Sequence, residues 1–161
     1  HERIMIINGP HDTTNGLDRL EGYLAEMNAH GFPVREEYIL KTQSQKSAGP
    51  TLAALAKVMR GKDRPTAIFA GGYYLALDVM VLLRRMNLEI PREVSLVGFD
   101  DPRSASLLSP ALTTIQQPLE DMGVRAYQRI VQLIKGENPS PRVELLPTTL
   151  VERDSAGPVG G

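Results

Sequence analysis

A continuous stretch from residue 64 to residue 101 constrains the fold more than any other part of the chain. Residues 66–70 form a short apolar run, typical of a buried parallel strand, and two glycines end it. Residues 74–86 contain no glycine or proline and carry apolar side chains at helical spacing. A second apolar run over 94–97 predicts another buried strand. The stretch therefore predicts one right-handed βαβ unit.

The carboxyl ends of these two strands are the expected place for a ligand, because open α/β sheets bind ligands just outside those ends. The residues that follow the strands are Gly71, Gly72, Tyr73 and Tyr74 after the first, and Asp100 and Asp101 after the second. The carboxylate of Asp100 would accept hydrogen bonds from ligand hydroxyl groups. Alternatively, Asp100 caps or braces its loop. Asp101 is expected to be structural.

The rest of the chain continues the alternation of strands and helices. Further strands are predicted over 4–7, 37–40, 112–115, 143–146 and 148–151, and further helices over 17–30, from Ser47 or Gly49 to about residue 59, and over 118–135. We therefore expect an α/β fold with an open, doubly wound parallel sheet in three α/β/α layers. The helix over 118–135 and the last two strands have no obvious partner in this order. The Gly/Pro-rich tail over 156–161 is expected to be frayed.

Composition excludes several classes of protein. With 18 Lys and Arg against 19 Asp and Glu, the chain has no general electrostatic attraction to nucleic acid or to an anionic membrane. No apolar run is long enough to span a bilayer, and the start has no signal-peptide pattern. The absence of cysteine excludes disulfides and fits a reducing compartment. The abrupt start at His1, directly before a strand, suggests a fragment of a longer protein.

Several segments in register match one family. They are residues 1–4, 19–23, 64–70, 91–101, 109–118 and 145–155, of which 91–101 reads Pro-Arg-Glu-Val-Ser-Leu-Val-Gly-Phe-Asp-Asp and 145–155 reads Leu-Leu-Pro-Thr-Thr-Leu-Val-Glu-Arg-Asp-Ser. Through them the chain resembles the effector-binding core of the LacI/GalR family of bacterial transcription regulators. The resemblance covers nearly the whole chain.

The resemblance implies a two-lobed core of the type I periplasmic-binding-protein kind, of which this chain is the C-terminal part. Residues 1–117 would form the C-terminal lobe, 118–147 would belong to an absent N-terminal lobe, and 148–161 would return and end in the frayed tail. The apolar face of the 118–135 helix would then be uncovered. We expect that helix to pack abnormally on its own chain, or on another copy by swapping.

The resemblance also implies effector contacts at Arg19 and Asp100. At Gly72-Tyr73 the family usually has Asn-Asp, so the amide contact is missing here, and Tyr73 or Tyr74 would stack on a sugar ring or simply fill volume. Asn8 is a further candidate. Weaker candidates are His11, Ser44 and Leu119. No cofactor is implied, and no metal site is expected, because no histidine or third carboxylate joins the aspartate pair in sequence.

The function implied is the effector-binding, dimerising portion of a cytoplasmic transcription regulator. A small molecule, sugar-like in chemistry, would bind between the lobes and control DNA binding by an absent helix-turn-helix. The helix over 75–86 and the loop at Leu107-Leu108 would contribute to a homodimer. The alternatives are a periplasmic sugar-binding receptor and, less favoured, a flavodoxin-like enzyme or phospho-receiver. No catalytic motif is present: the chain has neither a G-x-S-x-G elbow nor a dinucleotide fingerprint.

Overall fold

A six-stranded sheet forms the centre of the protein, with strand order β2-β1-β3-β4-β5-β6. The computed structural model describes residues 1–10, 13–42 and 48–159. The strands are β1 (Ile4–Asn8), β2 (Ile39–Lys41), β3 (Ala67–Ala70), β4 (Ser95–Phe99), β5 (Thr113–Gln116) and β6 (Thr149–Val151). The helices are α1 (Thr14–Ala29), α2 (Gly49–Met59), α3 (Tyr73–Arg85) and α4 (Leu119–Ile134), with short 3-10 helices η1 (Glu36–Tyr38) and η2 (Arg103–Leu107). The predicted α/β class with three layers is confirmed.

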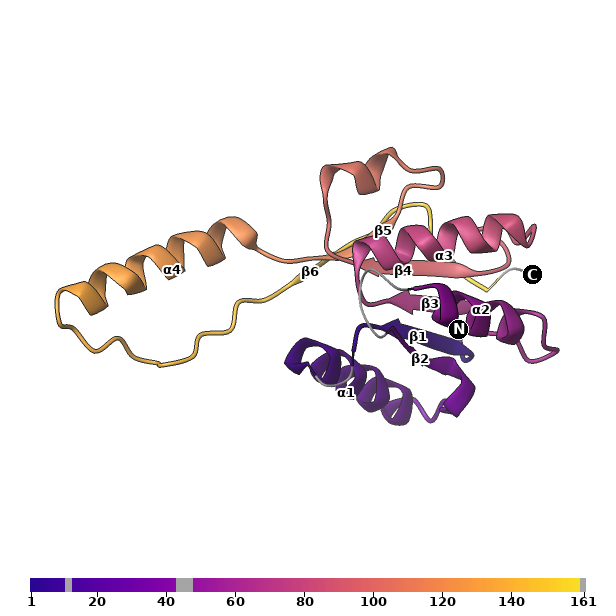
Figure 1. The fold of residues 1–161 in the computed structure, drawn as a ribbon, viewed down its shortest axis with the longest axis horizontal. Helices are drawn as coiled ribbons and strands as arrows, with labels where there is room; N and C mark the ends of the chain where they lie inside the picture. The colour runs from indigo at the N-terminus through magenta and orange to yellow at the C-terminus, as the bar shows by residue number, and fades with distance from the viewer. Residues whose placement is uncertain (11–12, 43–47, 160–161) are drawn as a thin grey trace.

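Helices cover both faces of the sheet, with α1 on one face and α2 and α3 on the other (Figure 1). Successive side chains of a strand point to opposite faces. Accordingly, Met5 and Ile7 of β1 pack in the cluster with α2 and α3, while Ile6 packs against α1. All three side chains are fully buried. This burial on both faces explains why the inner strands are continuous apolar runs rather than alternating ones.

The βαβ unit predicted from residues 64–101 is present as β3, α3 and β4. Strands β3 and β4 pair in parallel, with Ile68 opposite Leu96. On α3, Val79 and Leu83 are fully buried against the sheet. Both strands therefore end at the same edge of the sheet, and so do β1 and β5, which are also parallel to their neighbours.

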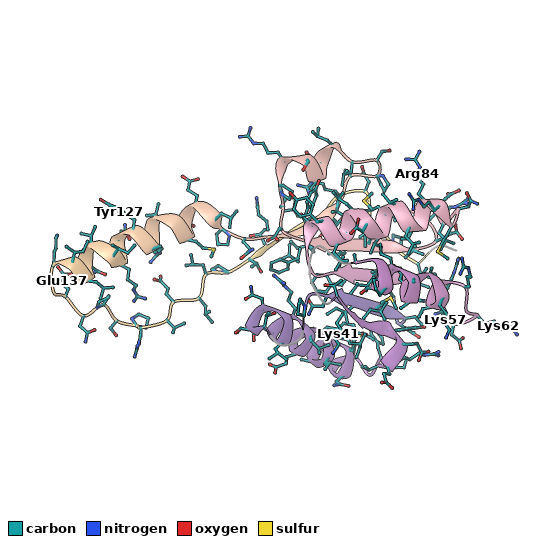
Figure 2. All side chains as sticks on the ribbon, viewed as in Figure 1. Lys41, Lys57, Lys62, Arg84, Tyr127 and Glu137 are labelled. Carbon is teal, nitrogen blue, oxygen red and sulfur yellow. The ribbon has the colours of Figure 1, made fainter. Side chains whose placement is uncertain are left out.

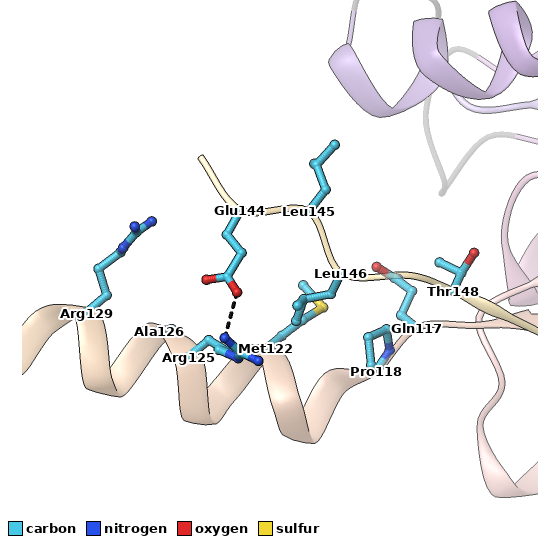
Figure 3. Close-up of a pocket in the computed structure, with 10 residues that line it drawn as sticks. All are labelled: Gln117, Pro118, Met122, Arg125, Ala126, Arg129, Glu144, Leu145, Leu146 and Thr148. Atoms are coloured by element: carbon cyan, nitrogen blue, oxygen red, sulfur yellow. Dashed lines mark hydrogen bonds and ion pairs between the residues drawn. The ribbon is translucent and has the colours of Figure 1, made fainter. Parts of the chain in front are cut away.

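Two sequence expectations about the strands are wrong in detail. Strand β6, for which the sequence predicted no direction, runs antiparallel to β5 in an otherwise parallel sheet. Residues 143–146 form no strand, because in the described part of the chain they run beside α4, where no strand offers backbone hydrogen bonds (Figure 3). The strand expected over 37–40 is displaced: η1 occupies Glu36–Tyr38, and β2 starts only at Ile39.

The tail is held more firmly than its composition predicts. The backbone N–H of Gly157 donates to the hydroxyl of Ser95 at 3.1 Å, and the Gly157 carbonyl accepts from the His1 ring at 2.9 Å. Ser155 is fully buried, and its hydroxyl donates to the Leu96 carbonyl at 2.6 Å. The expectation of a frayed tail is therefore wrong as far as Gly157, because polar partners on β4 bind its backbone. Residues 160 and 161 lie outside the described part.

Residues 118–147, here called the arm, extend away from the sheet (Figure 1). The arm comprises α4 and the segment that returns beside it. None of the α4 residues, all of which are described, is buried. Figure 2 shows Tyr127 and Glu137 far from the body of the protein. Within its own chain, α4 lines a cavity with the return segment, while Tyr127, Ile130 and Leu133 remain exposed. Packing on a second copy stays a prediction.

Among the described residues, no helix combines the length and the apolar character that a bilayer crossing requires.

Because the arm is uncovered, a Leu→Ala substitution in α4 should lower the free energy of unfolding much less than the same substitution in α3. Leu133 on α4 is 57% exposed and Leu83 on α3 is fully buried. Leu133→Ala is expected to change the free energy of unfolding by less than about 0.5 kcal/mol. Leu83→Ala should lower it by about 2–5 kcal/mol, because it removes core contacts and leaves a cavity. Urea unfolding in dilute solution measures both. Equal losses would mean that α4 is packed in solution.

Candidate functional site

A cavity of about 680 Å³ lies at the carboxyl edge of the sheet. It collects residues from loops that are far apart in sequence but follow neighbouring strands. Its walls include Gly9, Pro10, Thr13 and Arg19 after β1, Gly71 to Leu75 and Asp78 after β3, Asp100 to Pro102 and Ser104 after β4, and Gln117 and Leu119 after β5. The position agrees with the rule that open α/β sheets bind ligands at these strand ends. Four of the predicted residues, Arg19, Gly72, Tyr73 and Asp100, line this one cavity.

Arg19 brings a positive charge to the cavity wall. It lies on α1, and its Nη1 donates to the Gly71 carbonyl at 3.1 Å. Its guanidinium carbon lies 3.9 Å from the centroid of the Phe99 ring, so the planar cation stacks on the aromatic face. Partial burial lowers the pKa of Arg19, and the nearby Asp100 carboxylate partly offsets that effect. Arg19 stays charged and is held in a fixed orientation, with further N–H groups available to a ligand.

Asp100 is an exposed carboxylate in an unusual backbone conformation. It follows β4 with φ of 71°, a left-handed conformation that Asp tolerates better than most residues. Its backbone N–H donates to the Ile115 carbonyl at 3.0 Å, which keeps the loop against β5. Its Oδ1 accepts a hydrogen bond from Nε2 of Gln117 at 2.6 Å. The carboxylate therefore has both a place in the cavity wall and a partner within the chain.

Asp101 differs sharply from its neighbour. Its Oδ1 and Oδ2 accept from Nη1 and Nη2 of Arg153 at 2.7 and 2.9 Å, a bidentate ion pair. The hydroxyl of Thr114 donates to Oδ1 at 2.7 Å. The side chain of Asp101 is 9% exposed and that of Arg153 is 17% exposed. The hydrogen bond from Arg153 lowers the pKa of Asp101, although burial opposes the effect. Asp101 is thus a structural brace, as the sequence reasoning expected.

The two tyrosines form one side of the cavity at the start of α3. Their rings meet edge to face at a centroid distance of 5.5 Å. The hydroxyl of Tyr73 donates to that of Ser104 on η2 at 2.8 Å. Tyr74 is largely exposed, so its ring face is available. Gly72 precedes the helix without a side-chain cap, and a Cβ at this position would meet no atom within 4 Å.

Asn8 does not line the cavity, contrary to its place among the candidate residues. Its side chain is fully buried, and both ends of its amide have partners within the chain. Nδ2 donates to the Gly16 carbonyl at 2.7 Å, and Oδ1 accepts from the Gly9 N–H at 2.9 Å. A Cβ at Gly71 would lie 2.4 Å from that Oδ1. Asn8 therefore fixes the loop after β1, and glycine at position 71 leaves room for it.

Gln117, Ser104 and Asp78 line the cavity but were not predicted as site residues. Gln117 follows β5 at the same sheet edge, so applying the strand-end rule to β5 would have predicted it. Ser104 and Asp78 lie on η2 and α3, and nothing in their local sequence marks them. Leu119 lines the cavity, as expected. His11 and Ser44 lie outside the described residues.

The described residues contain no group of three His, Cys, Asp or Glu side chains able to hold a metal ion.

The sequence was compared with protein-family profiles and with curated proteins. A family profile for periplasmic binding protein-like domains matches residues 1–156. The HTH-type transcriptional repressor PurR of Yersinia pestis bv. Antiqua (strain Antiqua) is 34% identical over 155 residues, which are 96% of this chain and 45% of that protein. The chain thus spans about half the length of the curated relatives it matches.

Solved structures agree with the sequence relatives. A regulatory protein of the LacI family from Chloroflexus aggregans matches with a TM-score of 0.88 at 30% identity, over 98% of this chain and 56% of that one. The complex of the transcriptional regulator CelR with cellobiose matches with a TM-score of 0.85 at 30% identity, over 97% of this chain and 47% of that one. The chain is therefore similar to transcriptional regulators in both sequence and fold.

The ion pair of Asp101 predicts a pH-dependent loss of stability. Its pKa is lower in the folded protein than the ordinary value of 3.8, so its stabilisation is complete above that value and is lost as the pH falls through the folded pKa. Asp101→Asn is therefore expected to cost about 3 kcal/mol at pH 7, because Arg153 loses its charged partner, and much less near pH 2. Urea unfolding at several pH values measures this difference, with the exposed Asp154→Asn as control. A cost that does not change with pH would contradict the ion-pair account.

Proposed function

Because this chain belongs to the periplasmic-binding-protein-like family, as the effector-binding region of a LacI/GalR-type regulator, we propose that it binds a sugar-like effector in the cavity at the sheet edge. Binding would control the affinity of a helix-turn-helix reader, outside this chain, for operator DNA. The relatives that the chain matches are transcriptional repressors and not enzymes. They favour the regulator over a periplasmic receptor and over a flavodoxin-like enzyme.

The main support for the proposal is that Arg19 and Asp100 both line the same cavity. A sugar hydroxyl both donates and accepts hydrogen bonds. Arg19 supplies fixed donors and Asp100 supplies an exposed acceptor, so neighbouring hydroxyl groups of one ring would satisfy both. Tyr74 adds an exposed aromatic face for the apolar side of a sugar ring. The solved complex of CelR with cellobiose, a relative of similar fold, supports a sugar-like ligand.

We further propose that the arm belongs to a second lobe in the intact protein, with residues 118–147 crossing into it and 148–161 returning. The apolar residues of α4 support this division, because a helix with an uncovered apolar side needs a partner surface. In the intact protein that lobe would close over the cavity and complete the effector site. Limited proteolysis tests the division: cleavage should fall between residues 135 and 148 in this chain and disappear when the second lobe is present.

DNA binding and the cytoplasmic location belong to the same proposal. The net charge of −1 gives this chain no general attraction to DNA, so operator contact would come from the reader alone. A regulator of transcription acts in the compartment that holds the DNA. The sequence of the gene upstream of His1 discriminates the alternatives: a helix-turn-helix supports the regulator, whereas a signal peptide supports the periplasmic receptor.

A homodimer is proposed through the outer side of α3 and the neighbouring η2 helix. Leu107 is 83% exposed and Val81 is 50% exposed, and both lie on the body rather than on the arm. Val81→Glu is expected to convert a dimer into a monomer, since it would bury a charge in the interface. Light scattering over a concentration series measures the mass, with Val34→Glu, at an exposed valine between α1 and η1, as the matched control. A parent chain that stays monomeric at every concentration would refute this interface for the isolated chain.

The effector site itself is tested by calorimetric titration with cellobiose, D-glucose and D-ribose. We expect at least one of these sugars to bind the chain weakly, because only one wall of a two-lobed site is present. Asp100→Asn and Arg19→Gln should each weaken that binding by about tenfold or more, the cost of losing a charged hydrogen-bonding partner. Asp18→Asn, an exposed change on α1 outside the cavity, should leave it unchanged. Binding that survives both cavity variants would place the site elsewhere.

A further inference from the structure

Gln117 lies at the root of the arm and contributes to two cavities. It lines the cavity at the sheet edge together with Asp100. It also lines a smaller cavity of about 360 Å³, between the start of α4 and the return segment. Figure 3 shows Gln117 at the body end of that smaller cavity, beside Thr148 of the returning chain. One side chain therefore connects the candidate effector site with the base of the arm.

The two adjacent aspartates each hold one of the two chain segments that join the arm to the body. Gln117, where the chain leaves β5, donates to Asp100 at 2.6 Å. Arg153, just after the returning strand β6, donates to Asp101 at 2.7 and 2.9 Å. The outgoing and returning segments are thus both fixed to the end of β4.

The two connections differ in how easily they can be exchanged. The Asp101–Arg153 pair is largely buried, is charged on both sides and receives a further hydrogen bond from Thr114. Asp100 is exposed and is held by a neutral amide. A ligand hydroxyl can replace a neutral amide at an exposed carboxylate at little net cost, because one hydrogen bond is exchanged for another. It cannot replace a buried bidentate guanidinium without leaving a charge unpaired.

We infer that the Asp100–Gln117 hydrogen bond is a latch that a bound effector opens by competing for the Asp100 carboxylate. This inference rests on the proposed function, since it requires an effector at Asp100. Release of Gln117 removes the side-chain contact that holds the outgoing root beyond Gln116, which stays paired with Thr149, while Arg153 keeps the returning root in place. The arm then changes its orientation about the fixed Asp101–Arg153 pair. The sheet is not disturbed, because the backbone bond from Asp100 to Ile115 remains.

Thermodynamic linkage gives the latch a distinctive signature. If an effector must break the Asp100–Gln117 bond in order to bind, the bond opposes binding, and removing it must strengthen binding. A side chain that contacts the effector, or that merely supports the fold, would have the opposite effect or none. Gln117 acts here as a positioning residue for the arm, and Asp100 is the group shared between the arm and the effector.

The first test measures whether Gln117 holds the arm. The chain has no cysteine, so Lys57→Cys on α2 and Tyr127→Cys on α4 accept two spin labels at defined places (Figure 2). Both positions are exposed. Pulsed electron–electron double resonance measures the distance between the two labels. The distance distribution should broaden or shift when Gln117→Ala is added. Gln116→Ala, the same change at the exposed neighbour, should leave it unchanged. Identical distributions for the parent and Gln117→Ala would overturn the latch.

The second test measures competition, using the sugar that binds the parent chain among cellobiose, D-glucose and D-ribose. Gln117→Ala should bind that sugar roughly three- to tenfold more tightly, the range expected when one hydrogen bond no longer has to be broken. The same sugar should shift the distance distribution of the parent toward that of Gln117→Ala. Weaker or unchanged affinity in Gln117→Ala would overturn the competition. If none of the sugars binds the parent, the proposed function and the effector-driven step both fail, while the distance measurement still decides whether Gln117 holds the arm.

Discussion

The ion pair between Asp101 and Arg153 is the interaction on which the rest of the architecture depends. It joins the end of β4 to the chain that returns from the arm, across 52 positions of sequence. Burial makes the pair costly to break, because either partner alone would be a charge without its counter-ion. With this pair in place, β6 lies against β5 and Ser155 reaches its buried position between Leu96 and Thr113.

Fixing Asp101 also determines what Asp100 can do. The backbone is left-handed at Asp100, and the adjacent carboxylates have different surroundings: that of Asp101 is enclosed by Arg153 and Thr114, and that of Asp100 is exposed in the cavity wall. Under the proposed function, stability and recognition are thereby divided between two residues of the same type. The arm and the candidate effector site share this strand end, which is the short physical route that the proposed latch would use.

The sequence predicted the parts of the fold that depend on local patterns. Apolar runs such as 66–70 located the inner strands, and the strand-end rule placed Gly72, Tyr73 and Asp100 at the cavity, while Arg19 was expected there from the family resemblance. Prediction from the sequence failed where a segment's structure depends on a partner distant in sequence. Residues 143–146 have a strand-like composition but no strand beside them in the described chain, and the tail is held by Ser95 and His1. Asn8 has the right position for a ligand contact, but Gly16 and Gly9 occupy its amide.

Amide hydrogen exchange, read by mass spectrometry on peptides from this chain, tests the central role of the Asp101–Arg153 pair most directly. The account predicts that peptides covering residues 149–155 exchange as slowly as those of β3 and β4, although β6 lies at the edge of the sheet, whereas α4 exchanges much faster. In Asp101→Asn the protection of 149–155 should be lost while that of β1 and β3 remains. Exchange of residues 149–155 in the parent chain as fast as that of α4 would contradict the account.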